Sequence, residues 1–184
     1  KKIKIEMCGI SGIFSSKRQI EQSLKKMSMT LSHRGPDHSA IYVGDNFGLA
    51  HNRLSIIDLS DEANQPMTDN SERYVITYNG EIFNYMELRN ELTQIGCHFK
   101  TNSDTEVLLE GYKKNGEDFF NKIRGFFAVC IYDKKEGVAI FSRDIFGKKP
   151  LYFHANKEEF IFGSEIKSIL ETIKPKISVD FSSL

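Results

Sequence analysis

The feature that most constrains the fold is the placement of short apolar segments at both ends of the chain, with helical patterns between them. Short apolar or alternating runs bounded by turn residues are typical of strands. The segments expected to be strands are CGISGIF, SAIYVGD, NFGLAHNRL, RYVITYNG, GFFAVCIYD, GVAIFSRD, PLYFHA and EFIFGSE. Turns are expected at 44–46, 134–137 and 156–158, and Gly80 is expected at the end of its strand.

Amphipathic spacing predicts helices between and after these strands. In the first, Ser16 is the expected N-cap, and one face carries Ile20, Leu24, Met27 and Leu31. Strands at both ends of the chain with helices between them predict an α+β protein.

Capping residues and helix-ending glycines predict two further helices. One is capped by Asn84, ends at Gly96 and has Leu88, Leu92 and Ile95 on one face. The next opens with a capping box at 103–106 and ends at Gly116, and a short helix covers EIKSILETI near the end of the chain.

The charge balance excludes several kinds of partner. The 184 residues carry 25 Lys+Arg and 25 Asp+Glu, so no large basic surface is expected for nucleic acid or an anionic membrane. No run approaches the ~20 apolar residues that span a bilayer. The three cysteines fit neither a disulfide framework nor paired metal ligands, and we expect Cys97 and Cys130 to be buried packing residues in a reducing cytoplasm.

Phosphate-loop, dinucleotide and zinc-protease motifs are missing from the sequence, so no ATP or metal chemistry is expected within it. The basic segment 147–149 is interpreted as a solvated turn. The remaining candidates are polar residues at the ends of predicted elements: Cys8, the segment HRGPD, Arg53, the segment NGE and Asp104. Considered singly, each is more simply explained as a turn, a cap or a surface charge.

Considered together, the motifs carry more information. In order along the chain they are MCGISGIF, SHRGPD, HNRLSIID, YNGEIFNY, TNSDTEV, RDIFGKKPLY and GSEIKSIL. This series resembles the glutaminase domain of asparagine synthetases, which are class II glutamine amidotransferases with an N-terminal nucleophile. The resemblance covers nearly the whole chain, from Met7 to about Leu170.

The resemblance implies a fold and a reaction. The expected fold is a four-layer α/β/β/α sandwich of the Ntn-hydrolase type, with two antiparallel sheets packed face to face between helices. The expected reaction is hydrolysis of the side-chain amide of L-glutamine to glutamate and ammonia. Cys8 would supply the nucleophilic thiol and, where it is the first residue, its own α-amino group as the base.

The resemblance also assigns roles to site residues. The Asn79 side chain and the Gly80 N–H would form the oxyanion hole. Arg53 would bind the α-carboxylate of glutamine, while Asp104, with Glu81 nearby, would bind its α-ammonium group. The pocket wall would be the backbone of Leu54, Ser55, Ile56 and Ile57. Arg34 and Asp37 are expected to hold the pocket loops rather than touch the substrate.

The segment before Cys8 leaves three alternatives open. Residues 1–7 are interpreted as an extension to an amidotransferase domain spanning 8–172. Residues 1–6 are upstream of the true start at Met7, which we favour, or a propeptide that is removed, or a retained segment that blocks catalysis. In the last case the chain would be a glutamine-binding module without activity.

The segment 173–184 resembles the start of a linker to a synthetase domain that is absent from this sequence. The resemblance implies that such a domain or subunit uses the ammonia, with ATP and Mg²⁺, to convert aspartate to asparagine. The glutaminase domain itself is expected to need no cofactor and no metal. A stand-alone subunit, another carboxylate acceptor and a homodimer stay open.

Overall fold

The computed structural model describes residues 7–173. The predicted extension at 1–7, apart from Met7, and the predicted linker at 173–184, apart from Ile173, lie outside the described residues.

Two antiparallel sheets form the centre of the described chain. The first has five strands in the order β2-β3-β1-β9-β8. Their bounds are β1 Gly9–Ser15, β2 His38–Val43, β3 Phe47–Arg53, β8 Tyr152–Ala155 and β9 Glu159–Gly163. The central strand β1 pairs with β3 on one side and β9 on the other.

The second sheet has four strands in the order β4-β5-β6-β7. Their bounds are β4 Met67–Thr68, β5 Tyr74–Ile82, β6 Gly125–Asp133 and β7 Val138–Arg143. Strand β5 continues two residues past the predicted end at Gly80, so Asn79 and Gly80 lie within a strand, opposite Ala128 and Phe127 of β6.

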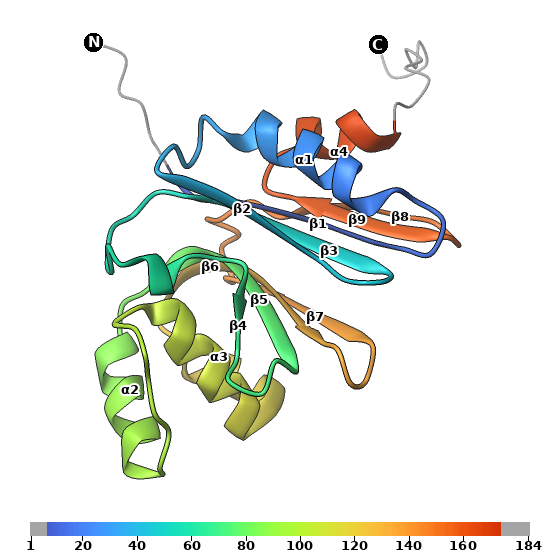
Figure 1. Ribbon diagram of the computed structural model, residues 1–184. Coiled ribbons are helices and arrows are strands. Elements are labelled where there is room, and N and C mark those ends of the chain that lie inside the picture. The colour runs from blue at the N-terminus through green and yellow to red at the C-terminus, as the bar shows by residue number, and fades with distance from the viewer. Residues whose placement is uncertain (1–6, 174–184) are drawn as a thin grey trace, which may run out of the picture.

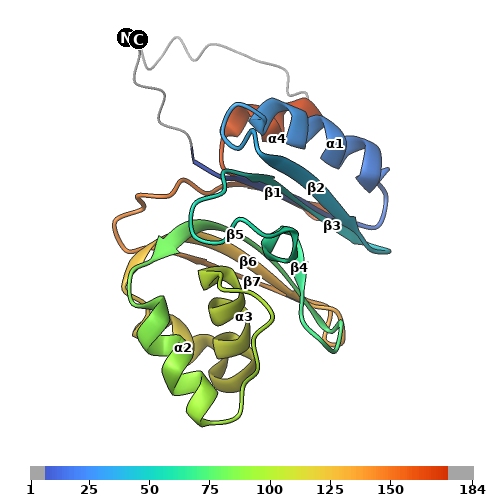
Figure 2. The same cartoon turned by 60° about the vertical axis from the view of Figure 1, so that its left-hand side comes forward.

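Helices cover the outer face of each sheet, as Figures 1 and 2 show. Helices α1 (Ile20–Leu31) and α4 (Ile166–Ile173) lie on the first sheet, and α2 (Tyr85–Gln94) and α3 (Asp104–Asn115) on the second. Two 3₁₀ segments, η1 (Asp61–Ala63) and η2 (Gly116–Lys122), complete the elements. The layers are therefore helix, sheet, sheet and helix, and the α+β class and the four-layer arrangement are confirmed.

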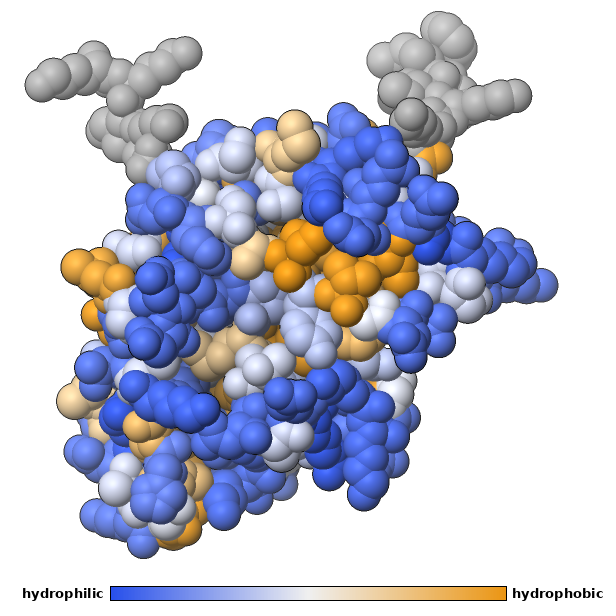
Figure 3. Space-filling model, viewed as in Figure 1, coloured by the Kyte–Doolittle hydropathy of each residue, from blue (hydrophilic) through white to orange (hydrophobic). Residues whose placement is uncertain are grey.

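Each interface between layers has its own apolar core. One lies under α1 and α4, one under α2 and α3, and one between the sheets, where Phe47, Leu49 and Phe162 are buried. Cys97 and Cys130 are buried in these cores, as predicted. Most of the face seen in Figure 3 is hydrophilic, and hydrophobic side chains gather mainly in one area at the level of the first sheet.

Several details of the helix predictions are wrong. Helix α1 begins at Ile20, and Ser16 is not its cap. The Arg18 guanidinium bonds the Glu159 carboxylate at 2.7 and 2.8 Å and the Thr172 carbonyl at 2.9 Å, which holds the preceding segment against β9 and α4.

At the end of α2, Ile95 is 59% exposed, because the chain turns there through Gly96 at φ 87°. Cys97 takes the buried position instead, and its N–H donates to the carbonyl of Leu92 at 3.0 Å.

Asn84 precedes α2, but its side chain does not cap the helix. It bonds Arg124 N–H at 2.9 Å and the Lys122 carbonyl at 3.0 Å. The predicted cap of α3 is confirmed, because the Ser103 hydroxyl accepts from the N–H of Glu106. The Glu106 carboxylate bonds the N–H groups of Lys100 and Thr101 rather than that of Ser103, so the capping box is only half formed.

Within residues 7–173, no helix is long and apolar enough to cross a membrane. In the same part of the chain, no three His, Cys, Asp or Glu side chains are grouped so that they could hold a metal ion.

Candidate active site

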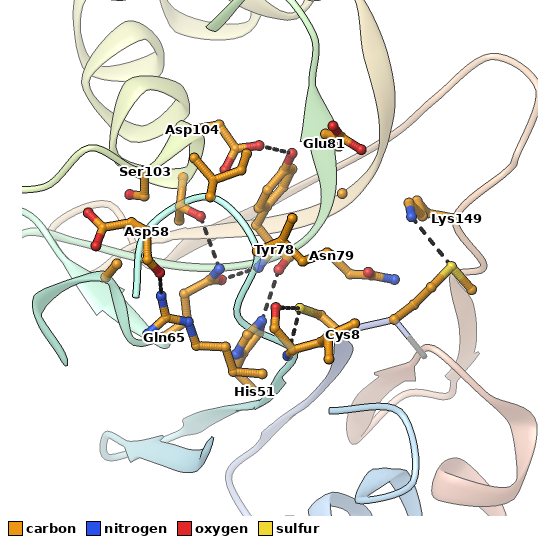
Figure 4. A pocket seen from close by; sticks show the side chains of 18 residues that line it. Cys8, His51, Asp58, Gln65, Tyr78, Asn79, Glu81, Ser103, Asp104 and Lys149 are labelled. Atoms are coloured by element: carbon orange, nitrogen blue, oxygen red, sulfur yellow. Dashed lines mark hydrogen bonds between the residues drawn. The ribbon is translucent and has the colours of Figure 1, made fainter. Parts of the chain in front are cut away.

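A cavity of about 160 Å³ lies where β1 begins and β3 and β5 end. Figure 4 shows the side chains that line it. Nine of the ten residues predicted for the site are among them: Cys8, Arg53, Leu54, Ile56, Ile57, Asn79, Gly80, Glu81 and Asp104. The fold thus gathers residues that are as far apart in the sequence as Cys8 and Asp104.

Cys8 directly precedes the central strand β1, and its sulfur lies against the backbone that follows β3. The N–H of Leu54 donates to Sγ at 3.3 Å, and the thiol lies 3.5 Å from the Leu54 carbonyl oxygen. Burial raises the pKa of the thiol, while the Leu54 N–H and the nearby cations Lys149 and Arg53 oppose that rise. The Leu54 N–H therefore stabilises the thiolate that a nucleophile requires.

Asn79 and Gly80 lie on β5, on the other sheet. Asn79 is 2% exposed, and its Nδ2 has no hydrogen-bond partner among the described residues. A buried amide donor without a partner is costly, which is typical of a site that supplies its partner from a ligand. Gly80 is required by packing, since a Cβ there would lie 2.6 Å from the Phe126 carbonyl oxygen.

The Arg53 guanidinium is buried and organises the loop that follows β3. It donates to the carbonyl of Ser60 at 2.9 Å, to Asn64 Oδ1 at 2.6 Å and to the carbonyl of Asp58. These bonds use three of the five N–H groups of an arginine, so two are free of such bonds within the described residues. Arg53 can therefore hold its loop and, at the same time, bind an anion in the cavity.

Ser55 differs from the sequence prediction, because it does not line the cavity. Its N–H donates to the Asp37 carboxylate at 2.7 Å. Asp37 thus holds the pocket loop, as predicted.

Arg34 also has the predicted supporting role. Its Nε donates to the carbonyl of Cys8 at 3.0 Å, and its Nη1 contacts the Glu165 carboxylate at 3.0 Å. Neither Arg34 nor Asp37 lines the cavity. Arg34 fixes the backbone of the residue that carries the thiol.

Asp104 is the first residue of α3 and is 5% exposed. Its Oδ2 accepts from the Tyr78 hydroxyl at 2.8 Å and from the N–H of Ile82 at 3.1 Å. Burial raises the pKa of this carboxyl, and the bonds from Tyr78 and Ile82 act against that rise. Glu81, the second predicted acid, is exposed and lines the same cavity.

Several residues that line the cavity are not predicted from the sequence, including Lys149, His51, Tyr78 and Gln65. His51 is fully buried, and its Nε2 donates to the carbonyl of Tyr78 at 3.1 Å. Burial lowers the pKa of His51 to about 3, so the ring is neutral.

The prediction of a solvated turn at 147–149 is wrong for Lys149, although Lys148 is exposed. The Asp144 carboxylate accepts from the N–H groups of Phe127, Lys148 and Lys149 at 2.9–3.2 Å and holds the loop against β6. This brings Lys149 to the cavity, where its Nζ lies 3.4 Å from the sulfur of Met7, and burial lowers the pKa of its amine.

Two solved structures share this fold. The chain superimposes on glutamine phosphoribosylpyrophosphate amidotransferase from Bacillus subtilis with a TM-score of 0.76 over 88% of this chain and 43% of that one. It superimposes on an allosteric regulatory enzyme of purine biosynthesis with a TM-score of 0.78 over 89% of this chain and 43% of that one. Both are 21% identical to it. The predicted Ntn-hydrolase fold is therefore confirmed.

The sequence comparison gives the family. The sequence model of the glutamine amidotransferase domain family matches residues 7–184, and the chain belongs to that family. Asparagine synthetase [glutamine-hydrolyzing] 1 of Bacillus subtilis is 41% identical over 169 residues, which cover 89% of this chain and 27% of that protein.

Two further relatives show the range of the family. Asparagine synthetase B of Escherichia coli is 38% identical over 168 residues, 89% of this chain and 30% of that protein. Amidase chry2 of Gibberella zeae is 34% identical over 178 residues, 89% of this chain and 26% of that protein. The chain therefore spans less than a third of the length of each of these three relatives.

Proposed function

We propose that this chain, when Cys8 is its first residue, hydrolyses the side-chain amide of L-glutamine to glutamate and ammonia. The observation that carries the proposal is the cavity in which a thiol with a backbone donor and a buried amide donor without a partner line the same space. An amide is a poor electrophile, so its hydrolysis needs a strong nucleophile and donors for the developing oxyanion.

In the proposed reaction, the Cys8 sulfur attacks the amide carbon, and a C–S bond forms as the carbonyl oxygen becomes an oxyanion. Asn79 Nδ2 and the Gly80 N–H bind that oxygen. The C–N bond then breaks, ammonia leaves with the proton taken from the thiol, and water hydrolyses the thioester to glutamate. The proton carrier is the α-amino group that Cys8 has as the first residue, because the ordinary pKa of such a group, ~7.7–8.0, suits both transfers.

Opposite charges at the two sides of the cavity support recognition of a free amino acid. Arg53 binds the α-carboxylate through the N–H groups that its loop leaves unused, and Asp104, with Glu81 at the exposed side, binds the α-ammonium group. A peptide-linked glutamine lacks both charges. The proposed hydrolysis needs no cofactor in this domain.

We further propose that the ammonia serves an ATP- and Mg²⁺-dependent conversion of aspartate to asparagine in a synthetase domain or subunit. The similarity to asparagine synthetases supports this proposal. A cytoplasmic location is part of it, because all three cysteines are free thiols.

The first experiment joins a glutaminase assay to mass spectrometry after exposure to diazo-oxo-norleucine, a reactive glutamine analogue. A protein that begins at Cys8 is expected to release ammonia and to carry one adduct on Cys8, and Cys8→Ala is expected to do neither. A matched Cys97→Ala variant, altered at a buried thiol outside the cavity, should retain both.

The same protein extended by residues 1–7 is expected to bind glutamine without releasing ammonia, because its Cys8 nitrogen is an amide and not a base. Full glutaminase activity in Cys8→Ala would refute the proposed function. Glutamine binding without ammonia release in the protein that begins at Cys8 would favour a glutamine-binding module instead.

A second candidate changes only the acceptor of the ammonia. The similarity to amidase chry2 favours it, because that relative carries another name within the same family. Assay of the longer protein with ATP and either aspartate or other carboxylates distinguishes the two, since only the true acceptor couples glutamine consumption to amide formation.

A further inference from the structure

The strongest unexplained feature of the cavity is the contact between two buried side chains on different layers. Tyr78 of β5 is 2% exposed and Asp104 of α3 is 5% exposed. The Tyr78 hydroxyl donates to Asp104 Oδ2 at 2.8 Å, as Figure 4 shows. Neither the fold nor the proposed reaction explains why a phenol stands at this position, since phenylalanine would fill the same space.

Tyr78 is held firmly in place relative to α3. Its backbone N–H donates to Gln65 Oε1 at 2.6 Å, and Gln65 Nε2 donates to the Thr105 hydroxyl at 3.0 Å. Gln65 therefore links the backbone of Tyr78 to the residue next to Asp104. His51 bonds the carbonyl of Tyr78 at 3.1 Å from the opposite sheet. These bonds hold the Tyr78 side chain in place, so that its hydroxyl donates to the Asp104 carboxylate.

A buried carboxylate tends to take up a proton, and a protonated Asp104 would no longer attract an ammonium group. A hydrogen bond donated by a neutral phenol favours the charged carboxylate without neutralising it. An arginine or lysine in the same place would compensate the negative charge and compete with the ligand. The phenol leaves that charge available.

We propose that Tyr78 is a positioning residue that keeps the Asp104 carboxylate ionised and oriented for the α-ammonium group of glutamine. The proposal rests on the proposed function, and it deepens it by giving the cavity a means to select substrates with a free amino group. Tyr78 itself touches the carboxylate and not the reacting atoms.

Other charged or titratable groups lie near Asp104, and their charges or hydrogen bonds are as follows. The cavity also holds Cys8, His51, Arg53, Asp58, Glu81 and Lys149. His51 stays neutral, since its pKa is about 3, and bonds from Ser60 and Asn102 lower the pKa of Asp58. From α2, Arg89 donates to the Thr101 carbonyl, and on α3 Glu106 is bonded to Lys100 and Thr101. The Tyr78 hydroxyl bonds Asp104.

The test compares two substrates as a function of pH. Glutamine carries the α-ammonium group, and glutaric acid monoamide has the same amide and carboxylate without it. In Tyr78→Phe, loss of the donor raises the pKa of Asp104 further. Protonation of Asp104 raises the KM for glutamine at low pH, and in Tyr78→Phe this rise is expected to begin about one pH unit higher. Below that pH, the KM of the variant is expected to be about tenfold higher than that of wild type. The kcat for glutamine and the KM for the monoamide are expected to be unchanged.

Two variants complete the design. Tyr112→Phe makes the same change on α3, in the same core but outside the cavity, and should move neither KM. Replacing Tyr78 with 3-fluorotyrosine keeps the hydroxyl and makes it a stronger donor, so the acid limb should shift to lower pH. This variant tests the proposal even where Tyr78→Phe does not fold.

The possible results separate the two proposals. A KM profile for glutamine that is identical in wild type, Tyr78→Phe and the fluorinated protein overturns the positioning role. An equal rise in KM for both substrates at all pH values also overturns it, because that is the result of a structural defect. Absence of ammonia release from glutamine by the otherwise unchanged protein that begins at Cys8 refutes the proposed function instead.

Discussion

The two ends of the space between the sheets are built from the same strands and hold opposite kinds of side chain. At one end Phe14 of β1 lies opposite Phe47 of β3. Tyr132 of β6 packs on both, with ring centroids 5.4 and 4.0 Å away. At the other end, β1 begins after Cys8 and β3 ends at Arg53, and buried polar groups line a cavity.

The difference separates the residues that contribute most to stability from those proposed to carry the activity. Aromatic rings exclude water and join the sheets at one end, and each contributes several kcal/mol when buried. At the other end Asn79 Nδ2 is buried without a partner, which costs stability. Substitutions at the two ends should therefore separate the free energy of unfolding from turnover.

The largest effect on stability is expected at the aromatic end. Phe162 is fully buried, and its ring lies 2.2 Å from where a Cβ of Gly12 would be. Phe162→Ala should lower the free energy of unfolding by about 3–5 kcal/mol, with kcat per folded molecule unchanged. Urea unfolding with a parallel assay measures both.

Phe153→Ala is the control, because Phe153 is 68% exposed and should cost about 1 kcal/mol or less. A large loss of kcat in folded Phe162→Ala would contradict the separation of the two ends.

At the polar end, Asn79→Ala should lower kcat for glutamine by about 10²–10³-fold through loss of an oxyanion donor. It should leave thermal stability unchanged or higher, since Nδ2 gives up no hydrogen bond within the described chain. The matched variant is Asn52→Ala, whose side chain bonds the Ser28 and Ser39 hydroxyls at 3.2 and 2.8 Å.

Asn52→Ala should lose about 1–3 kcal/mol of stability. A destabilised Asn79→Ala with normal kcat would reverse our assignment of that residue.

The polar end should also make stability depend on pH. Burial depresses the pKa of His51 from its ordinary 6.5 to about 3, so between these values the unfolded chain binds a proton that the folded chain does not. Stability due to the neutral ring is complete above pH 6.5 and is lost as the pH falls, by about 2 kcal/mol at pH 5. Unfolding of wild type and His51→Gln at pH 7 and pH 5 measures the loss, and an equal dependence in both would exclude His51 as its source.

The smallest effect is expected at Lys149. Its cation counteracts the burial that raises the pKa of Cys8. Lys149→Met should therefore slow alkylation of Cys8 by iodoacetamide at pH 7.5 by about two- to fivefold. Lys148→Met, which removes the adjacent exposed lysine, should leave the rate unchanged. A slower rate in both variants would indicate a long-range charge effect rather than a contact in the cavity.

Much of the fold could be predicted from local patterns, because apolar runs and caps act over a few residues. Ser103 caps α3 since it needs only the N–H of Glu106. Ser16 does not cap α1, because Arg18 bonds Glu159, which is 141 residues away. A pattern of neighbouring residues cannot predict a partner that is so far away in the sequence.

The site shows the same limit. Cys8, Asn79 and Asp104 stand out within motifs, and the structure brings them to one cavity. Their chemical roles stay predictions. Lys149 and Tyr78 could not be assigned from the sequence, since the first depends on Asp144 holding a loop and the second on a contact between β5 and α3.

The central position of β1 has a consequence for the lifetime of the site. The end of a chain normally frays, yet β1 pairs with β3 from Gly9 onward and with β9 from Ser11 onward. Gly9 and Ile10 are held by the β3 ladder, and from Ser11 onward the backbone of β1 cannot open without breaking both ladders. Amide hydrogens of this strand should exchange only when the whole domain unfolds, so thermal inactivation should coincide with global unfolding and not precede it.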